Sequence, residues 1–203
     1  MNPLPLSRRS FLLGLAVPAL PVPTQTVVFR SGEEGSNTFR IPAFFVTRRG
    51  TLLAFCEGRR NSRSDTGDID LVLKRSPDSG RTWSPLQVVA DHGPDTIGNP
   101  CPVQDRRTGI IWLPLTGNPG HISQKEILQG NATRTLWMSR STNDAASWDK
   151  PVEITRAVKD PNWTWCTTGP GNSIQLRTGR LLVPCDYSER GSTREHSWGD
   201  LPR

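Results

Sequence analysis

The chain has 203 residues and a formal net charge of +6 at pH 7, and 34% of its residues are hydrophobic. This composition is typical of a soluble globular protein and excludes a disordered tail and a polytopic membrane protein. There are 18 glycines and 18 prolines. Because these residues favour turns and interrupt helices, we expect short strands joined by tight turns, not an all-α or doubly wound α/β fold. The basic residues are scattered in pairs, a pattern that does not support nucleic-acid binding.

The N-terminus has the features of an export signal. Arg8 and Arg9 precede an apolar stretch over 11–22. This stretch is too short to cross a bilayer as a helix, so no membrane span is expected. Paired arginines followed by Phe-Leu are typical of a twin-arginine signal, which is an address read by a receptor. We therefore expect residues 1–23 to direct export by the twin-arginine route to the periplasm or the extracellular space.

From residue 24 onward, short apolar alternations are separated by turn residues, a pattern that predicts strands. The expected strands are 27–29, 40–47, 52–57, 70–75, 87–90, 103–105, 110–115, 134–139, 152–154, 173–176 and 181–185. Only a weak helical pattern occurs, over 124–129. The four cysteines, Cys56, Cys101, Cys166 and Cys185, lack metal-ligand spacing. Buried free thiols are favoured over disulfides, and neither a metal nor a cofactor is expected.

Two internal repeats run in phase along the chain. Gly50, Gly109 and Gly179 each close a turn that contains arginine and leads into an apolar strand. Residues 76–83 read S-x-D-x-G-x-x-W, and a weakened copy follows 65 residues later at 141–148. In such a box the Asp and Ser side chains accept hydrogen bonds from backbone N–H groups of a tight turn. The repeats predict radial blades of about four strands. The structural residues of the first box are Ser76, Asp78, Gly80 and Trp83.

The first box resembles the Asp-box, or BNR repeat, of sialidase-type propellers, and further segments extend the likeness. In chain order they are Phe39-Arg40-Ile41-Pro42, Leu52 to Arg60 with its Glu-Gly-Arg, Ser64 to Leu71, Asn99-Pro100-Cys101-Pro102 and Thr168-Gly169-Pro170-Gly171. Together they resemble bacterial exo-α-sialidases (neuraminidases) over residues 26–187. The resemblance implies an all-β, six-bladed β-propeller, of which this chain supplies roughly the first two and a half blades.

The same resemblance implies an exo-α-sialidase that hydrolyses terminal sialic acid from glycoconjugates with retention. Arg40 matches the first of three arginines that bind the sialic acid carboxylate, and a planar guanidinium suits that bidentate contact. Asp65 matches the acid/base aspartate that protonates the leaving-group oxygen. Asp68 and Asp70 are neighbouring alternatives, although Asp68 is better placed to support a turn and Asp70 leads into a strand.

Three further residues match the family less specifically. Arg59 resembles an arginine that points toward the substrate, and Asn99 resembles a residue on the acetamido and O4 side. Glu57 is a candidate partner of an active-site arginine. A loop arginine, a turn-stabilising asparagine and a strand-end ion pair explain the three equally well. Sialylated glycans or glycolipids are the expected partners, while linkage preference and the choice between hydrolysis and transfer stay open.

The sequence departs from the family in its second half. Sialidases use a tyrosine nucleophile, but the single tyrosine, Tyr187, lies in a segment that matches the middle of the propeller. The nucleophile, its glutamate and two further arginines belong to later blades. We expect 24–187 to be the N-terminal part of the propeller, 188–203 an aberrant or truncated tail, and the chain to be inactive alone. The alternative is a non-catalytic Asp-box propeller that binds glycan or protein.

Overall fold

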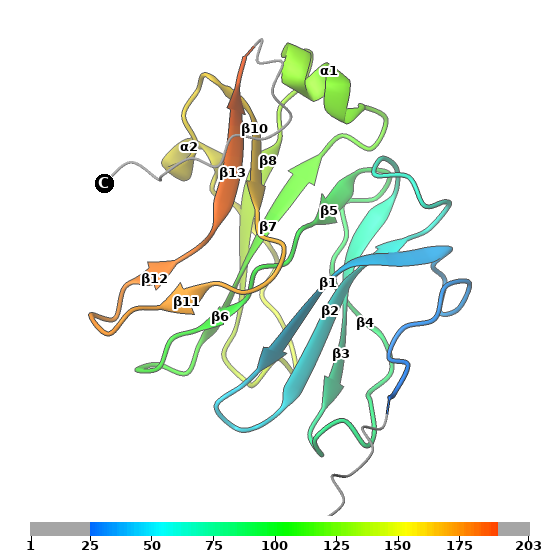
Figure 1. Ribbon diagram of the computed structural model, residues 1–203, viewed down its shortest axis with the longest axis vertical. Coiled ribbons are helices and arrows are strands. Elements are labelled where there is room, and N and C mark those ends of the chain that lie inside the picture. The colour runs from blue at the N-terminus through cyan, green and yellow to red at the C-terminus, as the bar shows by residue number, and fades with distance from the viewer. Residues whose placement is uncertain (1–24, 191–203) are drawn as a thin grey trace, which may run out of the picture.

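The computed structural model describes residues 25–190, so the expected export signal lies outside the described residues. Within this range the chain is all-β apart from two short helices, which confirms the predicted all-β class (Figure 1). The strands are β1 (Thr38–Val46), β2 (Leu52–Arg59), β3 (Ile69–Ser76), β4 (Gln87–Ala90), β5 (Thr96–Gly98), β6 (Val103–Gln104), β7 (Ile111–Asn118), β8 (Thr135–Ser141), β9 (Val152–Glu153), β10 (Trp163–Thr168), β11 (Ile174–Gln175), β12 (Leu181–Leu182) and β13 (Cys185–Glu189). The helices are α1 (Gln124–Gln129) and α2 (Thr155–Val158), and neither is long and apolar enough to cross a membrane.

The strands form repeated antiparallel units. The first is the meander β1-β2-β3-β4, and the second has β7 at its centre, paired with β5, β6 and β8, with β9 beyond. A single parallel pair, Ile69 with Thr96, joins these units into one nine-stranded sheet. The pairs β10-β13 and β11-β12 follow as two-stranded sheets. This succession agrees with the predicted repeat, although the described residues form no closed sheet.

The strand pattern fails to predict β5, β10 and β13. β5 has only three residues, Thr-Ile-Gly, and half of the six residues of β10 are threonine, so neither shows the sustained apolar alternation that marks a strand in sequence. The expected strand over 27–29 does not form. In β13 the strand continues to Glu189 and Ser188 is buried, so the segment expected to be irregular from residue 188 begins inside a strand. Residues 191–203 lie outside the described part of the chain.

Helix α1 has only a weak apolar pattern, and capping interactions at its two ends stabilise it. The Ser123 hydroxyl accepts a hydrogen bond from the Glu126 N–H, and the Glu126 carboxylate accepts one from the Ser123 N–H. This is a capping box, which satisfies N–H groups that the first turn leaves without partners. Gly130 closes the other end in a left-handed conformation, with φ +88°.

The first Asp-box forms the turn that its sequence predicts. The Asp78 carboxylate accepts hydrogen bonds from the Ser76 hydroxyl at 2.8 Å and from the Thr82 N–H at 2.9 Å. The Gly80 N–H donates to the Ser76 hydroxyl at 2.8 Å. The hydrogen bonds from the Thr82 N–H and hydroxyl lower the pKa of Asp78 to about 2. The carboxylate therefore stays ionised and keeps accepting these bonds at all but strongly acidic pH.

The weakened second box forms the same turn. The Asn143 amide oxygen accepts a hydrogen bond from the Ser147 N–H at 3.0 Å, and the Ala145 N–H donates to the Ser141 hydroxyl at 2.9 Å. Asparagine can replace aspartate because the turn requires only a side-chain oxygen at this position. Ala145 adopts φ +62° where the first box has glycine, so the substitution retains the turn at a cost in backbone strain. Trp148 then packs edge-on against Phe55.

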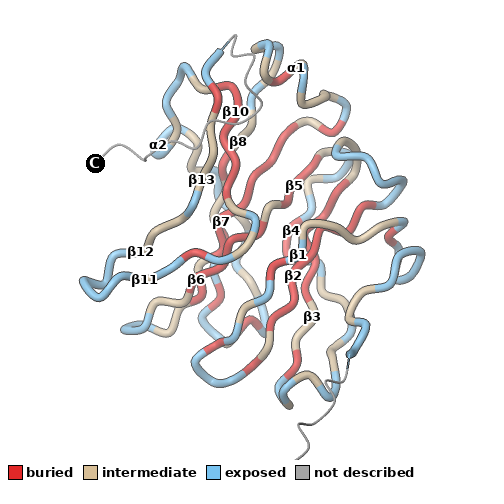
Figure 2. Tube along the Cα trace, viewed as in Figure 1, coloured by how far each residue is buried: buried red, intermediate tan, exposed pale blue. Residues whose placement is uncertain are grey.

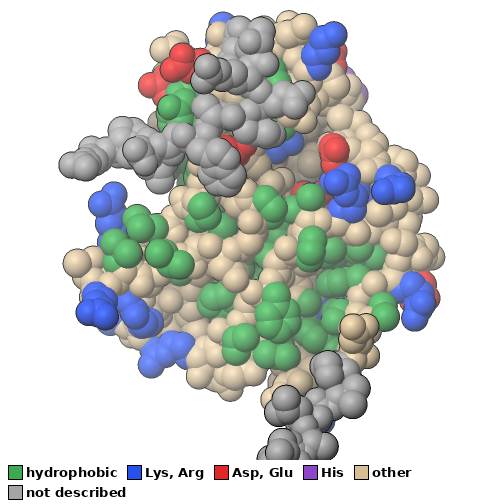
Figure 3. Space-filling view, in the orientation of Figure 1, with side chains coloured by type: hydrophobic (Ala, Val, Ile, Leu, Met, Phe, Trp, Pro, Cys, Tyr) green, Lys and Arg blue, Asp and Glu red, His purple; other side chains and the backbone are tan. Residues whose placement is uncertain are grey.

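The three turns that contain arginine are neighbours in space. Gly50, Gly109 and Gly179 have φ values of +84°, +77° and +92°, as expected for these turns. The Arg48 guanidinium donates a hydrogen bond to the Arg106 carbonyl. Arg106 in turn donates to carbonyl groups of the third turn. Basic side chains accordingly gather at the lower left of Figure 3.

The core lies between the two antiparallel units, where β2, β3 and β7 are almost continuously buried (Figure 2). Alternate residues of these strands meet there. They are Leu53, Phe55, Leu71, Leu73, Ile111, Leu113 and Leu115, all fully buried. Complete burial of such a side chain stabilises the fold by roughly 1.5–3 kcal/mol. The core therefore holds β2 firmly, and the last residues of this strand carry the candidate site.

Candidate active site

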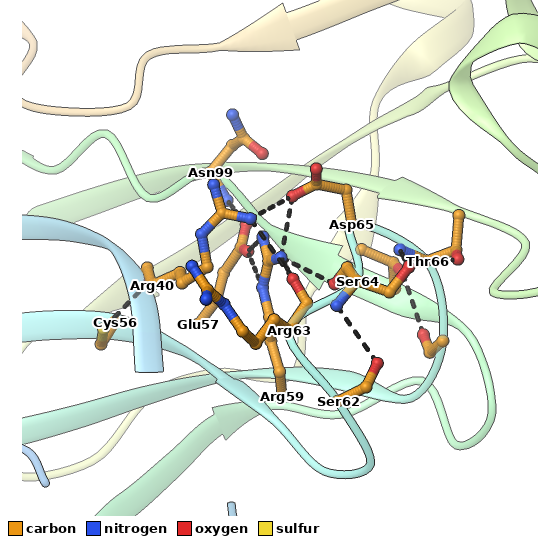
Figure 4. A network of polar contacts seen from close by, with 12 residues as sticks. Arg40, Cys56, Glu57, Arg59, Ser62, Arg63, Ser64, Asp65, Thr66 and Asn99 are labelled. Carbon is orange, nitrogen blue, oxygen red and sulfur yellow. Dashed lines mark hydrogen bonds and ion pairs between the residues drawn. The ribbon is translucent and has the colours of Figure 1, made fainter. Parts of the chain in front are cut away.

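Five polar side chains predicted from sequence converge at the start of β1 and the end of β2 (Figure 4). They are Arg40, Glu57, Arg59, Asp65 and Asn99. Arg40 lies on β1 and pairs with Glu57 on β2, while Arg59 follows two residues later on the same strand. Asp65 comes from the loop between β2 and β3, and Asn99 follows β5. The structure thus brings together groups that are up to 59 residues apart in the sequence.

A backbone irregularity lies directly beside Arg40. The register between β1 and β2 shifts between Arg40 and Ala43, and Ile41 has φ +56°. A β-branched residue seldom adopts a positive φ, and strain of this kind is common at functional sites. A bulge of this sort changes the direction of a side chain relative to the regular ladder. The Phe-Arg-Ile-Pro motif is therefore the segment in which β1 departs from regular geometry.

A buried ion pair lies beneath the site. The Glu57 carboxylate accepts hydrogen bonds from Arg59 Nη2 at 2.7 Å and Nε at 3.2 Å, and both side chains are about 3% exposed. The other Glu57 oxygen accepts the Asn99 N–H at 3.2 Å. A Cβ atom at Gly98 would lie 2.2 Å from that oxygen, so only glycine fits there. Glu57 therefore acts by orienting Arg59 and the backbone of Asn99.

We predict that Glu57→Gln lowers the free energy of unfolding by about 3 kcal/mol, because the change removes the buried counter-charge of the Arg59 guanidinium and leaves only the exposed Asp65 carboxylate to pair with it. Urea unfolding monitored by tryptophan fluorescence measures this loss. Glu153→Gln on β9 is the matched control, since Glu153 is exposed and should change the stability by less than about 0.5 kcal/mol. Equal midpoints for the two variants would show that the buried pair does not stabilise the fold.

Asp65 is held over the two arginines. Its Oδ1 atom lies 2.8 Å from Arg40 Nη1 and 2.8 Å from Arg59 Nη1. Arg59 also donates to the carbonyl groups of Arg63 at 2.8 Å and Ser64 at 2.6 Å. The loop thus rests on a buried guanidinium, while the Asp65 carboxylate itself stays 66% exposed. A substrate could reach both the carboxylate and Arg40 from solvent.

The charge around Asp65 determines its pKa. Partial burial acts to raise the pKa of this carboxyl, but the hydrogen bond from Arg59 and the charges of Arg59, Arg40 and Arg134 outweigh it. The pKa of Asp65 is therefore held below its usual value in the ligand-free site. A general acid in this state is ionised at neutral pH, so it needs a change in its surroundings before it can donate a proton.

The two neighbouring aspartates lie elsewhere. Asp68 and Asp70 both pair with Arg60, at 3.2 and 2.7 Å. Asp70 is buried in β3, and burial is the largest of the effects that raise its pKa to about 6. Neither contacts Arg40, so Asp65 is the carboxylate that the structure places beside the predicted carboxylate-binding arginine.

Sequence reasoning missed Arg134 and Trp165, which complete the site. The Arg134 guanidinium lies 3.8 Å above the centre of the Trp165 ring, and its Nη1 donates to the Thr167 hydroxyl at 3.4 Å. Burial lowers the pKa of Arg134 to about 10, so it remains charged at neutral pH. The structure places Trp165 against the Arg134 cation, and both residues line the site. No spacing signal connects these residues, because Arg134 directly precedes β8 and Trp165 lies on β10.

A cavity of about 210 Å³ opens between these groups. Its polar lining includes Glu57, Arg59, Asp65, Asn99, Arg134 and Asp186. Among residues 25–190, no group of three or more His, Cys, Asp or Glu side chains is arranged to hold a metal ion. The site therefore combines guanidinium groups that can bind a carboxylate with one accessible carboxyl group that can exchange a proton.

Comparison with known proteins assigns a family to this fold. Residues 50–200 match the BNR repeat-like domain. The chain belongs to this family. An exo-alpha-sialidase of Aspergillus fumigatus is 37% identical over 186 residues, covering 81% of this chain and 46% of the relative. A sialidase of Bacteroides fragilis is 31% identical over 182 residues, covering 82% of this chain and 33% of the relative.

Solved structures share the architecture of this BNR domain. A Hadza microbial sialidase superimposes with a TM-score of 0.72 at 29% identity, covering 79% of this chain and 34% of that one. A leech intramolecular trans-sialidase gives the same TM-score at 15% identity, which shows the fold alone. The BNR chain thus spans between a third and a half of the length of these sialidases. The family match over residues 50–200 includes Glu57, Arg59, Asp65 and Asn99 of the site.

Proposed function

We propose that the site belongs to an exo-α-sialidase, which removes terminal sialic acid from glycoconjugates with retention of configuration. The observation that carries the proposal is the convergence of Arg40, Arg59 and Asp65 beside a strained bulge in a chain similar to sialidases. Arg40 binds the sialic acid carboxylate, and Asp65 protonates the departing oxygen. Arg59 and Asn99 contact the substrate, and Glu57 orients both.

Ligand binding supplies the change in surroundings that Asp65 needs before it can donate a proton. In the ligand-free site the Asp65 carboxylate pairs with Arg40, whose guanidinium is also accessible to solvent. Asp65 thus occupies the place beside Arg40 that a substrate carboxylate would take. When the substrate carboxylate binds Arg40, it neutralises the positive charge that stabilises the ionised form of Asp65. It also places a negative charge near Asp65. Both effects raise the pKa of Asp65. Recognition of the acid sugar therefore prepares the proton donor for cleavage.

The same proposal extends to the fold and the setting of the protein. The strand units and paired Asp-boxes support a six-bladed β-propeller, in which the described residues form the first units. The paired arginines near the N-terminus support export by the twin-arginine route. Sialylated glycans outside the cytoplasm would then be the substrates.

Because we expect this chain to be inactive alone, turnover of 3′-sialyllactose by the protein with its complete propeller tests the proposal. Proton NMR should show lactose together with the α-anomer of free sialic acid as the first product, because retention goes through a covalent intermediate. Calorimetric titration with free sialic acid gives a second readout that needs no turnover. Binding without product would favour a glycan-binding propeller, and the absence of both binding and turnover would contradict the proposal.

A further inference from the structure

Three turns bring together arginines that are far apart in the sequence. The turns over 47–51, 105–109 and 176–180 contain six arginines, all of them exposed. Basic side chains gather at the lower left of Figure 3, beside β6, β11 and β12 of Figure 1. We call this surface the arginine face, and its members are Arg48, Arg49, Arg106, Arg107, Arg177 and Arg180. None of them lines the 210 Å³ candidate site, so the face is separate from that site.

A repeated glutamine contact fixes the three turns to one another. The Gln104 side chain accepts the Arg48 N–H at 2.8 Å and donates to the Gly109 carbonyl at 2.7 Å. Gln175 makes the same two contacts one turn further along, with the Arg106 N–H at 2.8 Å and with a carbonyl group of the third turn at 2.9 Å. The spacing of the arginines is therefore set before any partner binds, which lowers the entropy cost of binding.

The positive charge of the arginine face is not neutralised within residues 25–190. None of its six arginines forms an ion pair in that range. Arg48 and Arg106 donate to backbone carbonyl groups, which hold the side chains but carry no net charge. The acidic residue of the three turns is Asp105, whose carboxylate accepts the Arg107 N–H at 2.8 Å and the Thr108 hydroxyl at 2.9 Å. The face thus keeps an excess of positive charge that favours an anionic partner.

A polar cavity of about 320 Å³ lies between the first two turns. Its lining includes Arg48, Arg49, Gln104, Thr108, Thr142 and Asp144. These side chains supply both donors and acceptors, which suits the hydroxyl groups of a sugar, because a hydroxyl donates and accepts. The lining contains no aromatic side chain. Since single-stranded nucleic acids are held largely by stacking on aromatic rings, the cavity favours a sugar over a base.

Asp144 is the acidic residue in this lining, and its charge is directed inward. Its side chain is only 9% exposed. The Asp144 Oδ2 atom accepts the Thr51 hydroxyl at 2.5 Å and lies 3.8 Å from Arg75 Nη2. The charge that the cavity presents to solvent is therefore dominated by Arg48 and Arg49.

We propose that the arginine face binds an anionic glycan, a carbohydrate chain that carries carboxylate or sulfate groups along its length. Guanidinium groups bind such oxyanions through paired hydrogen bonds. Those of Arg107 and Arg177 form no hydrogen bond or ion pair in the described part of the chain, so they are available to contact successive anions. Sugar hydroxyls enter the 320 Å³ cavity between the first two turns.

Recognition by the arginine face requires several anions at once. A single exposed ion pair contributes at most about 1 kcal/mol, so a monosaccharide with one carboxylate, such as free sialic acid, is not retained there. A chain with repeated anions makes several contacts, and each contact raises the effective concentration for the next. The inference does not rest on the proposed function, because binding of a glycan chain is measured without turnover.

Calorimetric titration of the protein with chondroitin sulfate tests the proposal. This glycan carries both carboxylate and sulfate groups. We expect binding that weakens by about tenfold or more when the salt concentration is raised from about 50 to about 200 mM, because each contact releases counterions. Dextran, a glycan without charge, should not bind. Single-stranded DNA and vesicles of phosphatidylglycerol are the competing probes, and both should bind more weakly than chondroitin sulfate.

The double variant Arg107→Glu, Arg177→Glu should weaken binding of chondroitin sulfate by about tenfold or more, because two contacts become repulsive. Neither side chain holds the turns together, so the fold should be retained, which circular dichroism checks. The double variant Arg30→Glu, Arg156→Glu is the matched control. It changes the net charge equally at exposed positions outside the three turns and should weaken binding by less than about twofold.

An absence of binding to chondroitin sulfate would overturn the proposal, as would an equal loss of affinity in the two double variants. Tighter binding to single-stranded DNA or to the anionic vesicles would overturn it in favour of a nucleic acid or a membrane surface. Because the comparison of probes uses the unmutated protein, it decides the matter even where a variant fails to fold.

Discussion

In the protein with its complete propeller, Asp65→Asn is expected to lower kcat for 3′-sialyllactose by on the order of 10²-fold or more, because the amide retains the shape of the carboxylate but cannot donate a proton to the leaving oxygen. An acidic phenol departs with less help from a proton donor, so Asp65→Asn should lower kcat less for a sialoside that has such a phenol as its leaving group. Steady-state kinetics on the two substrates measure the difference. Asp68→Asn is the control from the same loop, since Asp68 pairs with Arg60 instead.

The pH profile separates proton donation from a structural role for Asp65. In the free site the arginines hold the pKa of Asp65 below its usual value. The protonated form needed for donation is then lost as the pH rises through that low pKa, and this limb appears in kcat/KM. Substrate binding raises the pKa, so the limb in kcat should lie at higher pH. Identical limbs, or an equal loss of rate on both leaving groups, would contradict the assignment.

Arg40→Ala is expected to weaken the binding of free sialic acid by on the order of 10²-fold, because a charge-assisted bidentate contact to the carboxylate is lost. Titration calorimetry with sialic acid measures the change. The methyl ester of sialic acid lacks the charge and should bind the unmutated protein weakly, with little further loss in the variant. Arg49→Ala is the matched control, because Arg49 lies in the exposed turn at the far end of the same hairpin.

Asp65 makes the Arg40 prediction more specific. Because its carboxylate already pairs with Arg40 at 2.8 Å, removing Arg40 also removes a charge that lowers the pKa of Asp65. The pKa limb in kcat/KM should therefore move to higher pH in the Arg40 variant. If Arg40→Ala and Arg49→Ala weaken binding equally, Arg40 does not recognise the carboxylate.

Local patterns are sufficient to predict the strands that are amphipathic or buried along their length. The residues of β2 and β3 read as apolar alternations because these strands supply the core, and the turn glycines mark their ends. Patterns fail for β10, where threonine and tryptophan alternate with little net hydropathy. Such residues become buried only because neighbouring strands cover them.

The candidate site divides in the same way. Arg40, Glu57, Arg59, Asp65 and Asn99 could be found from motifs, since each lies in a segment of distinctive sequence. Arg134 and Trp165 could not, because their contact joins residues 31 positions apart and depends on how the segment before β8 packs against β10.

The sequence by itself determined the all-β class, the repeat of strand units and Asp-boxes, and the chemical types of the site residues. These features are local, because periodicity and turn chemistry act between residues a few positions apart. Only the tertiary structure decided that Asp65 rests on Arg40 and Arg59, that Glu57 is buried, and that the pKa of Asp65 is lowered. Electrostatic interaction and burial depend on distances between separate strands, and strand pairing sets those distances.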